Sequence, residues 1–162
     1  LSAAGEKYLD SLKETEIVRL KPEKDDSDTQ SAVNFAIDRG AKNITIFGAT
    51  GNRIDHLLAN FGLLVLGRER GTDIILIDQW NYMKLVESGT VLKKKEQFGK
   101  YVSFFSLEGD MPGLTLVGFK YPLDHYHLRV SDSGLTVSNE IEAEEAVVSF
   151  DGKSLLMLMT RD

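Results

Sequence analysis

The sequence contains no cysteine, and only three prolines and one tryptophan, among its 162 residues. The absence of cysteine excludes disulfides, thiolate metal sites and cysteine nucleophiles. No apolar run approaches the roughly 18 residues that a membrane-spanning helix requires. The start of the chain has no secretory signal pattern either. We therefore expect no membrane partner and a cytoplasmic location.

Positive charge is also scarce, because 19 Lys and Arg stand against 25 Asp and Glu and leave a net charge of −6. A broad, non-specific nucleic-acid surface needs an excess of positive charge, so we expect no nucleic-acid partner. A local polyphosphate site stays compatible with this balance, since it needs only a few donors and a metal ion. The apolar share of 42% is ordinary for a globular domain.

In the first half of the chain, helical and strand-like patterns alternate. A capping box, with Ser27 at the cap and Gln30 three residues later, predicts a helix that ends at Gly40. The expected buried stripe of this helix is Ala32, Phe35 and Ala36. Further helices are expected over residues 1–12 and 54–67, the latter with Leu57, Leu58, Phe61, Leu64 and Val65 on one side. Strands are expected over residues 17–20, 44–47 and 73–78. This order predicts a parallel sheet with helices packed on it.

After residue 80 the sequence pattern changes to short strand-like runs. Their starts lie roughly 8–12 residues apart, which is typical of an antiparallel sandwich. The runs cover residues 83–86, 90–92, 101–106, 114–119, 127–130, 135–138, 146–150 and 155–160. Asp151-Gly152 predicts a type I′ hairpin between the last two. The predicted organisation is a parallel-sheet α/β domain over residues 1–80 and an antiparallel β-sandwich over residues 81–162, with the boundary near residues 79–82.

Acidic residues cluster at positions 23–28, between an expected strand end and a helix start, where α/β sheets place ligands. Asp25 and Asp28 are three residues apart and offer hard oxygen ligands suited to Mg²⁺. The helix N-terminus nearby offers amides to phosphate. In the alternative interpretation, these acids only complement the helix dipole.

A second cluster occupies the glycine-containing turn at residues 48–56. Glycines allow the backbone to approach a ligand closely, and Arg53 can bind phosphate oxygens bidentately. Asp55 can orient Arg53, hold a metal-bound water or cap the helix, and His56 can donate to phosphate or support the turn. The glycine spacing fits neither a Walker loop nor a dinucleotide fingerprint. A plain connector is the alternative.

A third group of polar residues lies near the end of the chain. Ser138 and Asn139 follow an expected strand and can offer polar groups to a ligand, but from the residues alone an ordinary turn is the favoured interpretation. Tyr121 and Trp80 can form flat walls for a heteroaromatic ligand, although aromatics in such places also serve as core or interface. His125 and His127 would share a strand face, but without a third ligand they are expected to be surface residues.

Taken in order, residues 23–32, 48–60, 118–123 and 138–140 resemble the bacterial type of thiamine pyrophosphokinase. The most specific element is Arg53-x-Asp55-His56-x-x-x-Asn60. The resemblance implies an α/β catalytic domain and a thiamine-binding β-sandwich, paired as a homodimer. It also implies Mg²⁺-dependent transfer of a pyrophosphoryl group from ATP, the co-substrate, to the thiamine hydroxyl, which gives thiamine diphosphate and AMP.

The resemblance assigns roles to individual residues. Asp25 and Asp28 match the acidic metal and substrate site, and with Asp55 they are the candidate catalytic residues. Ser27 replaces the usual Thr but keeps its hydroxyl, whereas Gln30 replaces a common Glu. Arg53 and Asp55 match the nucleotide-phosphate loop, which His56 and Asn60 support. The thiamine side comprises Ser138, Asn139 and Tyr121.

One departure from the family pattern concerns the metal site. The family carries a Gly-Asp-Phe-Asp-Ser motif on an early strand, whose aspartates help to hold Mg²⁺, and the sequence contains no such motif. We therefore expect that the parent protein has a further segment ahead of Leu1. Two other functions are compatible with the sequence. One is a non-catalytic thiamine- or small-ligand-binding sandwich with an incomplete transferase domain, and the other is a different nucleotide-dependent transferase.

Overall fold

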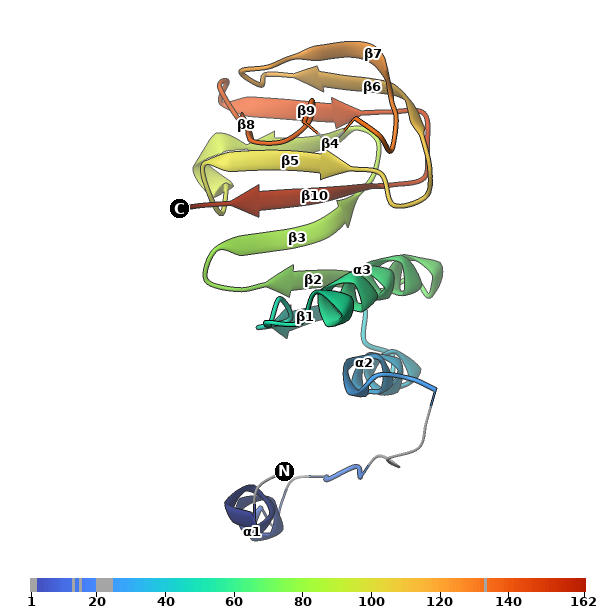
Figure 1. The fold of residues 1–162 in the computed structure, drawn as a ribbon, viewed down its shortest axis with the longest axis vertical. Coiled ribbons are helices and arrows are strands. Elements are labelled where there is room, and N and C mark those ends of the chain that lie inside the picture. The colour runs from blue at the N-terminus through green and yellow to red at the C-terminus, as the bar shows by residue number, and fades with distance from the viewer. Residues whose placement is uncertain (1–2, 13, 15, 20–24, 133) are drawn as a thin grey trace.

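The structure of the chain is a computed structural model that describes residues 3–12, 14, 16–19, 25–132 and 134–162 (Figure 1). Its helices are α1 (Ala3–Ser11), α2 (Asp28–Asp38) and α3 (Ile54–Glu69), with a short 3₁₀ helix η1 (Lys94–Glu96). The strands are β1 (Asn43–Phe47), β2 (Asp73–Ile77), β3 (Asn81–Val86), β4 (Thr90–Lys93), β5 (Tyr101–Phe105), β6 (Met111–Val117), β7 (Leu123–Leu128), β8 (Asn139–Glu140), β9 (Glu145–Ser149) and β10 (Leu155–Thr160).

The strands form two sheets, and the larger one extends through both halves of the chain. Its order is β1-β2-β3-β10-β5-β8, whereas the smaller sheet has the order β4-β9-β6-β7. In the described part of the chain, parallel pairing joins only β1 to β2, and β3 joins β2 antiparallel. The expected parallel sheet is therefore one parallel pair within a mixed sheet. Because β2 pairs with β3, the sheet is continuous across residues 79–82.

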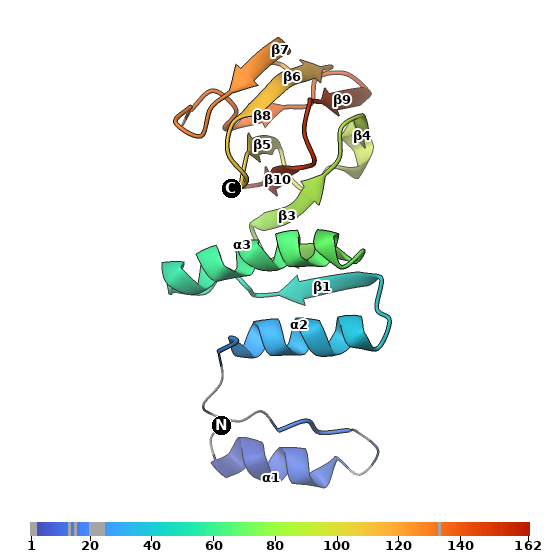
Figure 2. The same cartoon turned by 90° about the vertical axis from the view of Figure 1, so that its right-hand side faces the viewer.

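Helices α2 and α3 cover one face of the β1–β2 end of this sheet. Their buried side chains form one apolar cluster with the strands, which contains Val33, Ile37, Leu63, Leu64, Ile74, Leu76, Met83 and Leu156. The starts of both helices and the carboxyl end of β1 lie toward the same side of the molecule, the left in Figure 2. This arrangement brings the acidic cluster and the glycine-containing turn to one end of the sheet.

The second half of the chain is a sandwich of two sheets around a shared apolar core (Figure 1). Strands β3, β10 and β5 face β4, β9 and β6. The most deeply buried large side chains of this core are Phe104, Leu114, Leu116, Leu155 and Met157. Such close packing excludes water from both inner faces and accounts for the alternation of apolar and polar residues along the strands. The expected antiparallel sandwich is confirmed.

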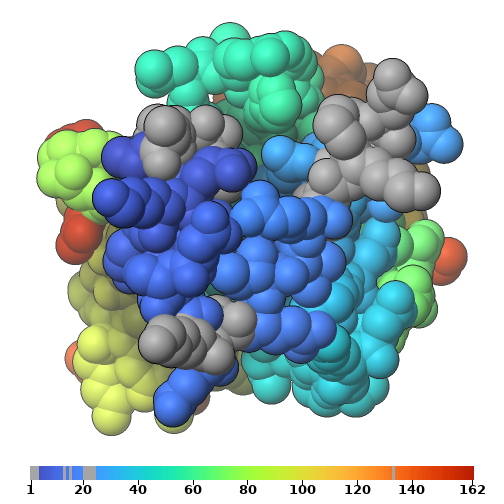
Figure 3. Space-filling view, turned by 90° about the horizontal axis from the view of Figure 1, so that it is seen from below, coloured from blue at the N-terminus to red at the C-terminus, as the bar shows by residue number. Residues whose placement is uncertain are grey.

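The first described segment is held mainly by ion pairs. Arg19 contacts Glu6 and Asp10 of α1 at 3.5 and 3.2 Å, and Arg39 after α2 contacts Glu16 at 2.8 Å. Figure 3 shows α1, in dark blue, covering part of this end of the molecule. The expected helix is confirmed, but the strand expected at 17–20 is wrong for residues 17–19, which have no strand partner there. Residue 20 lies outside the described residues.

The helices form where expected but bury different faces. In α2 the buried residues are Val33 and Ile37, whereas Phe35 is 39% exposed with the Arg39 guanidinium 3.7 Å from its ring centroid. In α3, Asn60, Leu63, Leu64 and Gly67 are buried and Leu58 is 62% exposed. The expected stripes of both helices are therefore partly wrong. Each helix contained two overlapping apolar stripes, and the contact between the helices and the sheet selected one of them.

The strands of the second half also differ in detail from their expected ranges. Strands β6 and β7 begin earlier than expected, at Met111 and Leu123. Residues 135–138 form a turn instead of a strand, because the buried Thr136 hydroxyl donates to the Phe104 carbonyl at 2.5 Å. The expected hairpin at Asp151-Gly152 is wrong. Strand β9 pairs with β4 and β6, whereas β10 pairs with β3 and β5, so the segment crosses between the sheets.

The packing of α3 on β2 can be tested with two glycine substitutions in α3. A Cβ added at Gly67 would lie 2.6 Å from the Ile74 side chain and 2.8 Å from the Thr72 carbonyl oxygen, whereas one at Gly62 would meet nothing within 4 Å. We expect Gly67→Ala to lower the free energy of unfolding by about 1–3 kcal/mol through overpacking. The control Gly62→Ala should raise it by roughly 0.5–1 kcal/mol through helix propensity. Urea denaturation measures both, and equal effects would contradict the packing.

Candidate functional site

The turn after β1 lies at the carboxyl edge of the parallel strand pair. Residues 48–53 connect β1 to α3, and Gly48 and Gly51 have positive φ angles of +69° and +40° that favour glycine. The Gly48 amide donates to the Ile77 carbonyl at the end of β2, at 3.0 Å. The turn therefore spans the ends of both parallel strands, which is where open α/β sheets bind ligands.

Arg53 and Asp55 form a two-pronged ion pair at the start of α3. Arg53 Nε donates to Asp55 Oδ1 at 3.1 Å and Arg53 Nη2 donates to Asp55 Oδ2 at 2.5 Å. Asp55 Oδ1 also accepts the His56 amide at 3.0 Å. Hydrogen bonding and charge attraction in this pair raise the pKa of Arg53 and lower that of Asp55. Both side chains are well exposed, at 70% and 64%, so an anionic ligand can reach the guanidinium.

Asn60 supports the same turn from inside the helix. Its side chain is 7% exposed, and its Nδ2 donates to the Ala49 carbonyl at 2.8 Å. A buried amide used in this way holds a loop in place and does not contact a ligand directly. His56 is exposed on the first turn of α3. The structure thus places Arg53, Asp55 and Asn60 around one turn, to which His56 contributes its backbone amide.

Asp78, which sequence analysis missed, is the most connected polar side chain near this turn. Asp78 Oδ2 accepts the Thr50 hydroxyl at 2.5 Å, and Oδ1 accepts the amides of Trp80 and Asn81 at 2.7 Å each. Burial raises the pKa of Asp78, but these hydrogen bonds outweigh it and hold the pKa below its usual value. A signal was available in the sequence, because an aspartate directly after a buried strand marks the ligand-binding edge of such a sheet.

The acidic cluster lies at the start of α2. The Ser27 hydroxyl accepts the Gln30 amide at 3.1 Å, so the predicted capping box forms on its serine side. Asp28 is the first residue of α2, and Asp26 Oδ2 accepts Asn34 Nδ2 at 3.4 Å. Residues 23 and 24 of the cluster lie outside the described residues.

The carboxylates of Asp25 and Asp28 are the hard oxygen ligands that Mg²⁺ prefers. Within the described ranges, no three acidic or histidine side chains are grouped to hold a metal ion. Two carboxylates nevertheless match the usual protein share of a Mg²⁺ site, because this ion keeps several waters and takes phosphate oxygens as further ligands.

The third polar group is organised around a fully buried amide. Asn139, 2% exposed, donates from Nδ2 to the Tyr121 carbonyl at 2.8 Å, and its Oδ1 accepts the amides of Tyr121 and Glu140 at 3.0 and 2.9 Å. Ser138 has a positive φ of 58°, and its amide donates to Ser103 Oγ at 3.0 Å. A non-glycine residue held in this region is uncommon and often marks a functional loop. Residue 133 lies outside the described residues.

Tyr121 is presented to solvent by this buried amide. Its side chain is 56% exposed, and Lys120 Nζ lies 5.6 Å from its ring centroid. Glu140, which sequence analysis did not assign, pairs with Lys120 at 2.9 Å and with Lys100 at 3.6 Å. These lysines lower the pKa of Glu140. The loop therefore offers an aromatic face beside a carboxylate.

The turn at residues 48–53 and the loop that carries Tyr121 lie at the same end of the strands of the six-stranded sheet, but far apart. Strand register connects them through a continuous row of paired residues, namely Phe47, Ile77, Tyr82, Met159, Val102 and Asn139. Five strand spacings of about 4.8 Å put the two ends of the row roughly 24 Å apart. Within a single chain, these two candidate groups of residues are therefore separate.

His125 and His127 each lie beside a different aspartate. His125 has a positive φ of 45° and its Nδ1 lies 2.6 Å from Asp124 Oδ1, whereas His127 Nε2 lies 3.2 Å from Asp110 Oδ2. Both side chains are exposed, as the sequence led us to expect.

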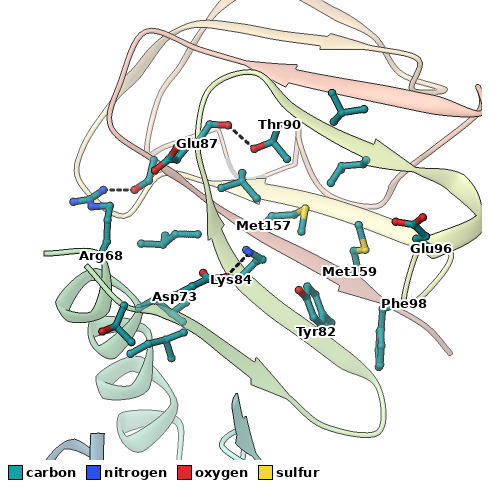
Figure 4. Close-up of a pocket in the computed structure, with 18 of the residues that line it drawn as sticks. Arg68, Asp73, Tyr82, Lys84, Glu87, Thr90, Glu96, Phe98, Met157 and Met159 are labelled. Carbon is teal, nitrogen blue, oxygen red and sulfur yellow. Dashed lines mark hydrogen bonds and ion pairs between the residues drawn. The ribbon is translucent and has the colours of Figure 1, made fainter. Parts of the chain in front are cut away.

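A groove of about 690 Å³ lies between α3, β3, β4 and β10 (Figure 4). Its residues include none of those expected at a site. Its cationic side chains are paired, since Lys84 binds Asp73 at 2.9 Å, Arg68 binds Glu108 at 2.8 Å and Lys93 lies 3.8 Å from Glu96. Arg53 is paired as well, but its side chain is 70% exposed, against 22% for Arg68 and 25% for Lys84, so the strand-end turn is the better candidate for an anionic ligand.

Across the described ranges, none of the helices combines the length and the apolar character needed to cross a membrane.

Comparison with protein families gives two matches in chain order. The catalytic domain of thiamin pyrophosphokinase matches residues 3–76, and the vitamin B1 binding domain of thiamin pyrophosphokinase matches residues 89–155.

Individual relatives give the same result. The chain is 36% identical over 140 residues to the thiamine pyrophosphokinase of Bacillus subtilis strain 168. The aligned region covers 86% of this chain and 65% of that protein. The crystal structure of thiamine pyrophosphokinase from Bacillus subtilis matches with a TM-score of 0.79 and 35% identity, over 86% of this chain and 65% of that one. The chain thus spans 65% of the length of these relatives.

A third relative covers the whole of this chain. The crystal structure of a thiamin pyrophosphokinase family protein from Enterococcus faecalis matches with a TM-score of 0.84 and 34% identity, over 100% of this chain and 76% of that one. The expected combination of an α/β part and an antiparallel β part is thereby confirmed. With two family domains matched in order and a relative of this identity, the chain belongs to the thiamin pyrophosphokinase family.

Proposed function

We propose that the chain transfers a pyrophosphoryl group from ATP to the hydroxyl of thiamine, giving thiamine diphosphate and AMP. One observation carries the proposal, namely the exposed Arg53 guanidinium held by Asp55 at the carboxyl edge of the parallel strands. We assign one substrate to each of the two predicted domains. Residues 1–80 bind ATP and Mg²⁺, and residues 81–162 bind thiamine.

The nucleotide half-site is built to bind the triphosphate. Arg53 offers parallel N–H donors to phosphate oxygens, and a guanidinium with fixed orientation loses less conformational entropy on binding. Asp55 provides this orientation, Asn60 fixes the turn through the Ala49 carbonyl, and His56 offers a further donor. Local cationic donors of this kind suffice in an acidic protein, because phosphoryl-type transfer depends on positioning and electrostatics.

Asp25 and Asp28 would hold Mg²⁺ through their carboxylate oxygens. When bound, the ion neutralises charge on the phosphates during transfer. The Ser27 cap keeps both carboxylates at the start of α2, which lies toward the same side of the molecule as the start of α3 (Figure 2). The N-terminus of α2 adds a partial positive charge for an anionic ligand.

The reaction itself exchanges one P–O bond for another. The thiamine hydroxyl oxygen bonds to the β-phosphorus of ATP, while the bond from that phosphorus to the oxygen bridging to the α-phosphate breaks. AMP leaves with that bridging oxygen and its electron pair. The hydroxyl proton passes to a carboxylate, either Asp25 or Asp28.

The thiamine half-site uses the Tyr121 loop. Thiamine carries heteroaromatic rings, so the exposed Tyr121 ring offers it a flat wall, whereas the Glu140 carboxylate is already paired with Lys120 and Lys100. Ser138 offers polar atoms on the same loop. Asn139 acts as a positioning residue, because its amide is buried and fully used in holding the Tyr121 backbone.

A homodimer would bring the two half-sites together. The reacting atoms must approach within about 3–3.5 Å, whereas the two half-sites of one chain are roughly 24 Å apart by strand spacing. A two-fold symmetric pair can place the nucleotide turn of one copy against the Tyr121 loop of the other, because such an interface is self-complementary. We therefore propose that each active site is shared between two copies.

Phosphorus NMR of the chain with ATP, Mg²⁺ and thiamine tests the proposed reaction directly. We expect AMP and thiamine diphosphate to appear together. ADP as the product would instead indicate a different nucleotide-dependent transferase. Thiamine binding without any turnover would favour the non-catalytic alternative.

In the same assay, Arg53→Ala should lower kcat/KM for ATP by about 2 kcal/mol, or roughly thirtyfold, because a charge-assisted contact is lost. The matched control is Arg70→Ala, which removes another exposed arginine, one that pairs with Asp38 at 2.7 Å at the far end of α3. This control should leave the kinetics unchanged. Equal kinetics for the two variants would refute the role of Arg53.

Complementation tests whether the active site is shared between copies. Alone, Arg53→Ala should impair use of ATP, and Asn139→Ala should raise the KM for thiamine more than that for ATP. Mixing the two variants should restore activity, because one site of each mixed dimer combines an intact turn with an intact Tyr121 loop. A mixture no more active than the average of its components would show that the site lies within one chain.

A further inference from the structure

The turn at residues 48–53, called the nucleotide turn below, contains two glycines but is closely held by hydrogen bonds in the structure. Two of its glycines have positive φ, and such residues have many accessible conformations in a free chain. Within the described part of the chain, three hydrogen bonds hold residues 48–50 of this turn. Gly48 donates to Ile77, Asn60 donates to Ala49, and Thr50 donates to Asp78. Only the last joins the middle of the turn to a charged side chain.

Asp78 connects this turn to a second one. Besides the Thr50 hydroxyl, it accepts the Trp80 amide, the Asn81 amide and the Asn81 side chain, the last at 3.0 Å. The far side of the 79–80 turn is also anchored, because the Arg161 amide donates to the Trp80 carbonyl at 3.1 Å and Arg161 Nε donates to the Gln79 carbonyl at 2.9 Å. Trp80 is therefore held between the nucleotide turn and the end of β10.

A carboxylate beside a phosphate site would normally repel the ligand. Asp78 avoids part of this cost, because donors from three residues surround its oxygens and offset its charge locally. These contacts indicate that Asp78 holds the backbone of the turn, whereas Arg53 would contact the ligand.

We propose that Asp78 is a positioning residue for nucleotide binding, which acts through the Thr50 hydroxyl and couples occupation of the turn to Trp80. This inference rests on the proposed function, because it takes the turn at residues 48–53 as the triphosphate site. Its physical basis is preorganisation, since a turn already held in the binding conformation loses less entropy when ATP binds.

Variants at Thr50 separate this role from a general effect on folding. Thr50→Val removes the hydroxyl at constant shape, and Thr50→Ser keeps it. Calorimetry with ATP and Mg²⁺ should give a Kd roughly tenfold higher for Thr50→Val, the expected loss of one hydrogen bond to a charged group, and a near-normal Kd for Thr50→Ser. The KM for thiamine should stay unchanged in both variants, and their Tm values show whether the fold is intact.

Fluorescence reports on the coupling, because Trp80 is the sole tryptophan and is 48% exposed. We expect ATP to change its emission in the unaltered chain, and saturating ATP to change it much less in Thr50→Val. The double variant Thr50→Val, Asp78→Asn should bind ATP no more weakly than Thr50→Val alone, because Asp78 acts through that hydroxyl.

The possible failures are distinguishable. If the unaltered chain and Thr50→Val bind ATP equally while Arg53→Ala binds it weakly, the proposed function stands and the role of Asp78 is overturned. A parallel rise in the thiamine KM of Thr50→Val would also overturn it, since that indicates a general structural defect. If the unaltered chain binds no ATP, the proposed function falls, and this inference falls with it.

Discussion

Backbone hydrogen bonds between β2 and β3 join the parallel pair to the strands of the sandwich, and the place of each candidate half-site depends on that junction. The register of the six-stranded sheet continues from Phe47 to Asn139 without interruption. It therefore sets both the common edge on which the half-sites lie and the distance between them. A chain whose two parts were merely linked would have no such constraint on its geometry.

This constraint explains how the proposed site divides its chemistry. The β1–β2 end carries an accessible guanidinium, whereas the β8 end carries an aromatic ring next to a carboxylate. The first suits an anion, and the exposed ring of the second suits a flat heteroaromatic ligand. Because the sheet separates them within one chain, the two proposed substrates would bind far apart, and the proposed homodimer would bring them into contact.

Much of the local structure could be predicted from short-range patterns. Ser27 capped α2 as its spacing to Gln30 indicated, and Arg53 paired with Asp55 two residues away. Asn60 reached back to the turn, consistent with its place in the Arg-x-Asp-His-x-x-x-Asn element. These interactions connect residues no more than eleven positions apart, so local backbone geometry largely decides them.

Long-range partners were decided only by the tertiary structure. Asp151-Gly152 looked like a hairpin, but β9 and β10 pair in different sheets. Phe35 and Leu58 looked like core, but Val33, Ile37 and Leu63 met the neighbouring elements instead. Asp78 and Thr50, 28 residues apart, and Asn139 and Tyr121, 18 residues apart, met because strand register brought their loops together.

The sequence by itself thus determined the family, the types of most elements and the residues of the α2 cap and of the turn before α3. The tertiary structure decided which helix faces are buried, which strands pair across the sheets and which polar side chains hold the loops. The physical reason is that a cap or turn closes its hydrogen bonds within a few residues, whereas burial and sheet pairing depend on surfaces contributed by distant parts of the chain.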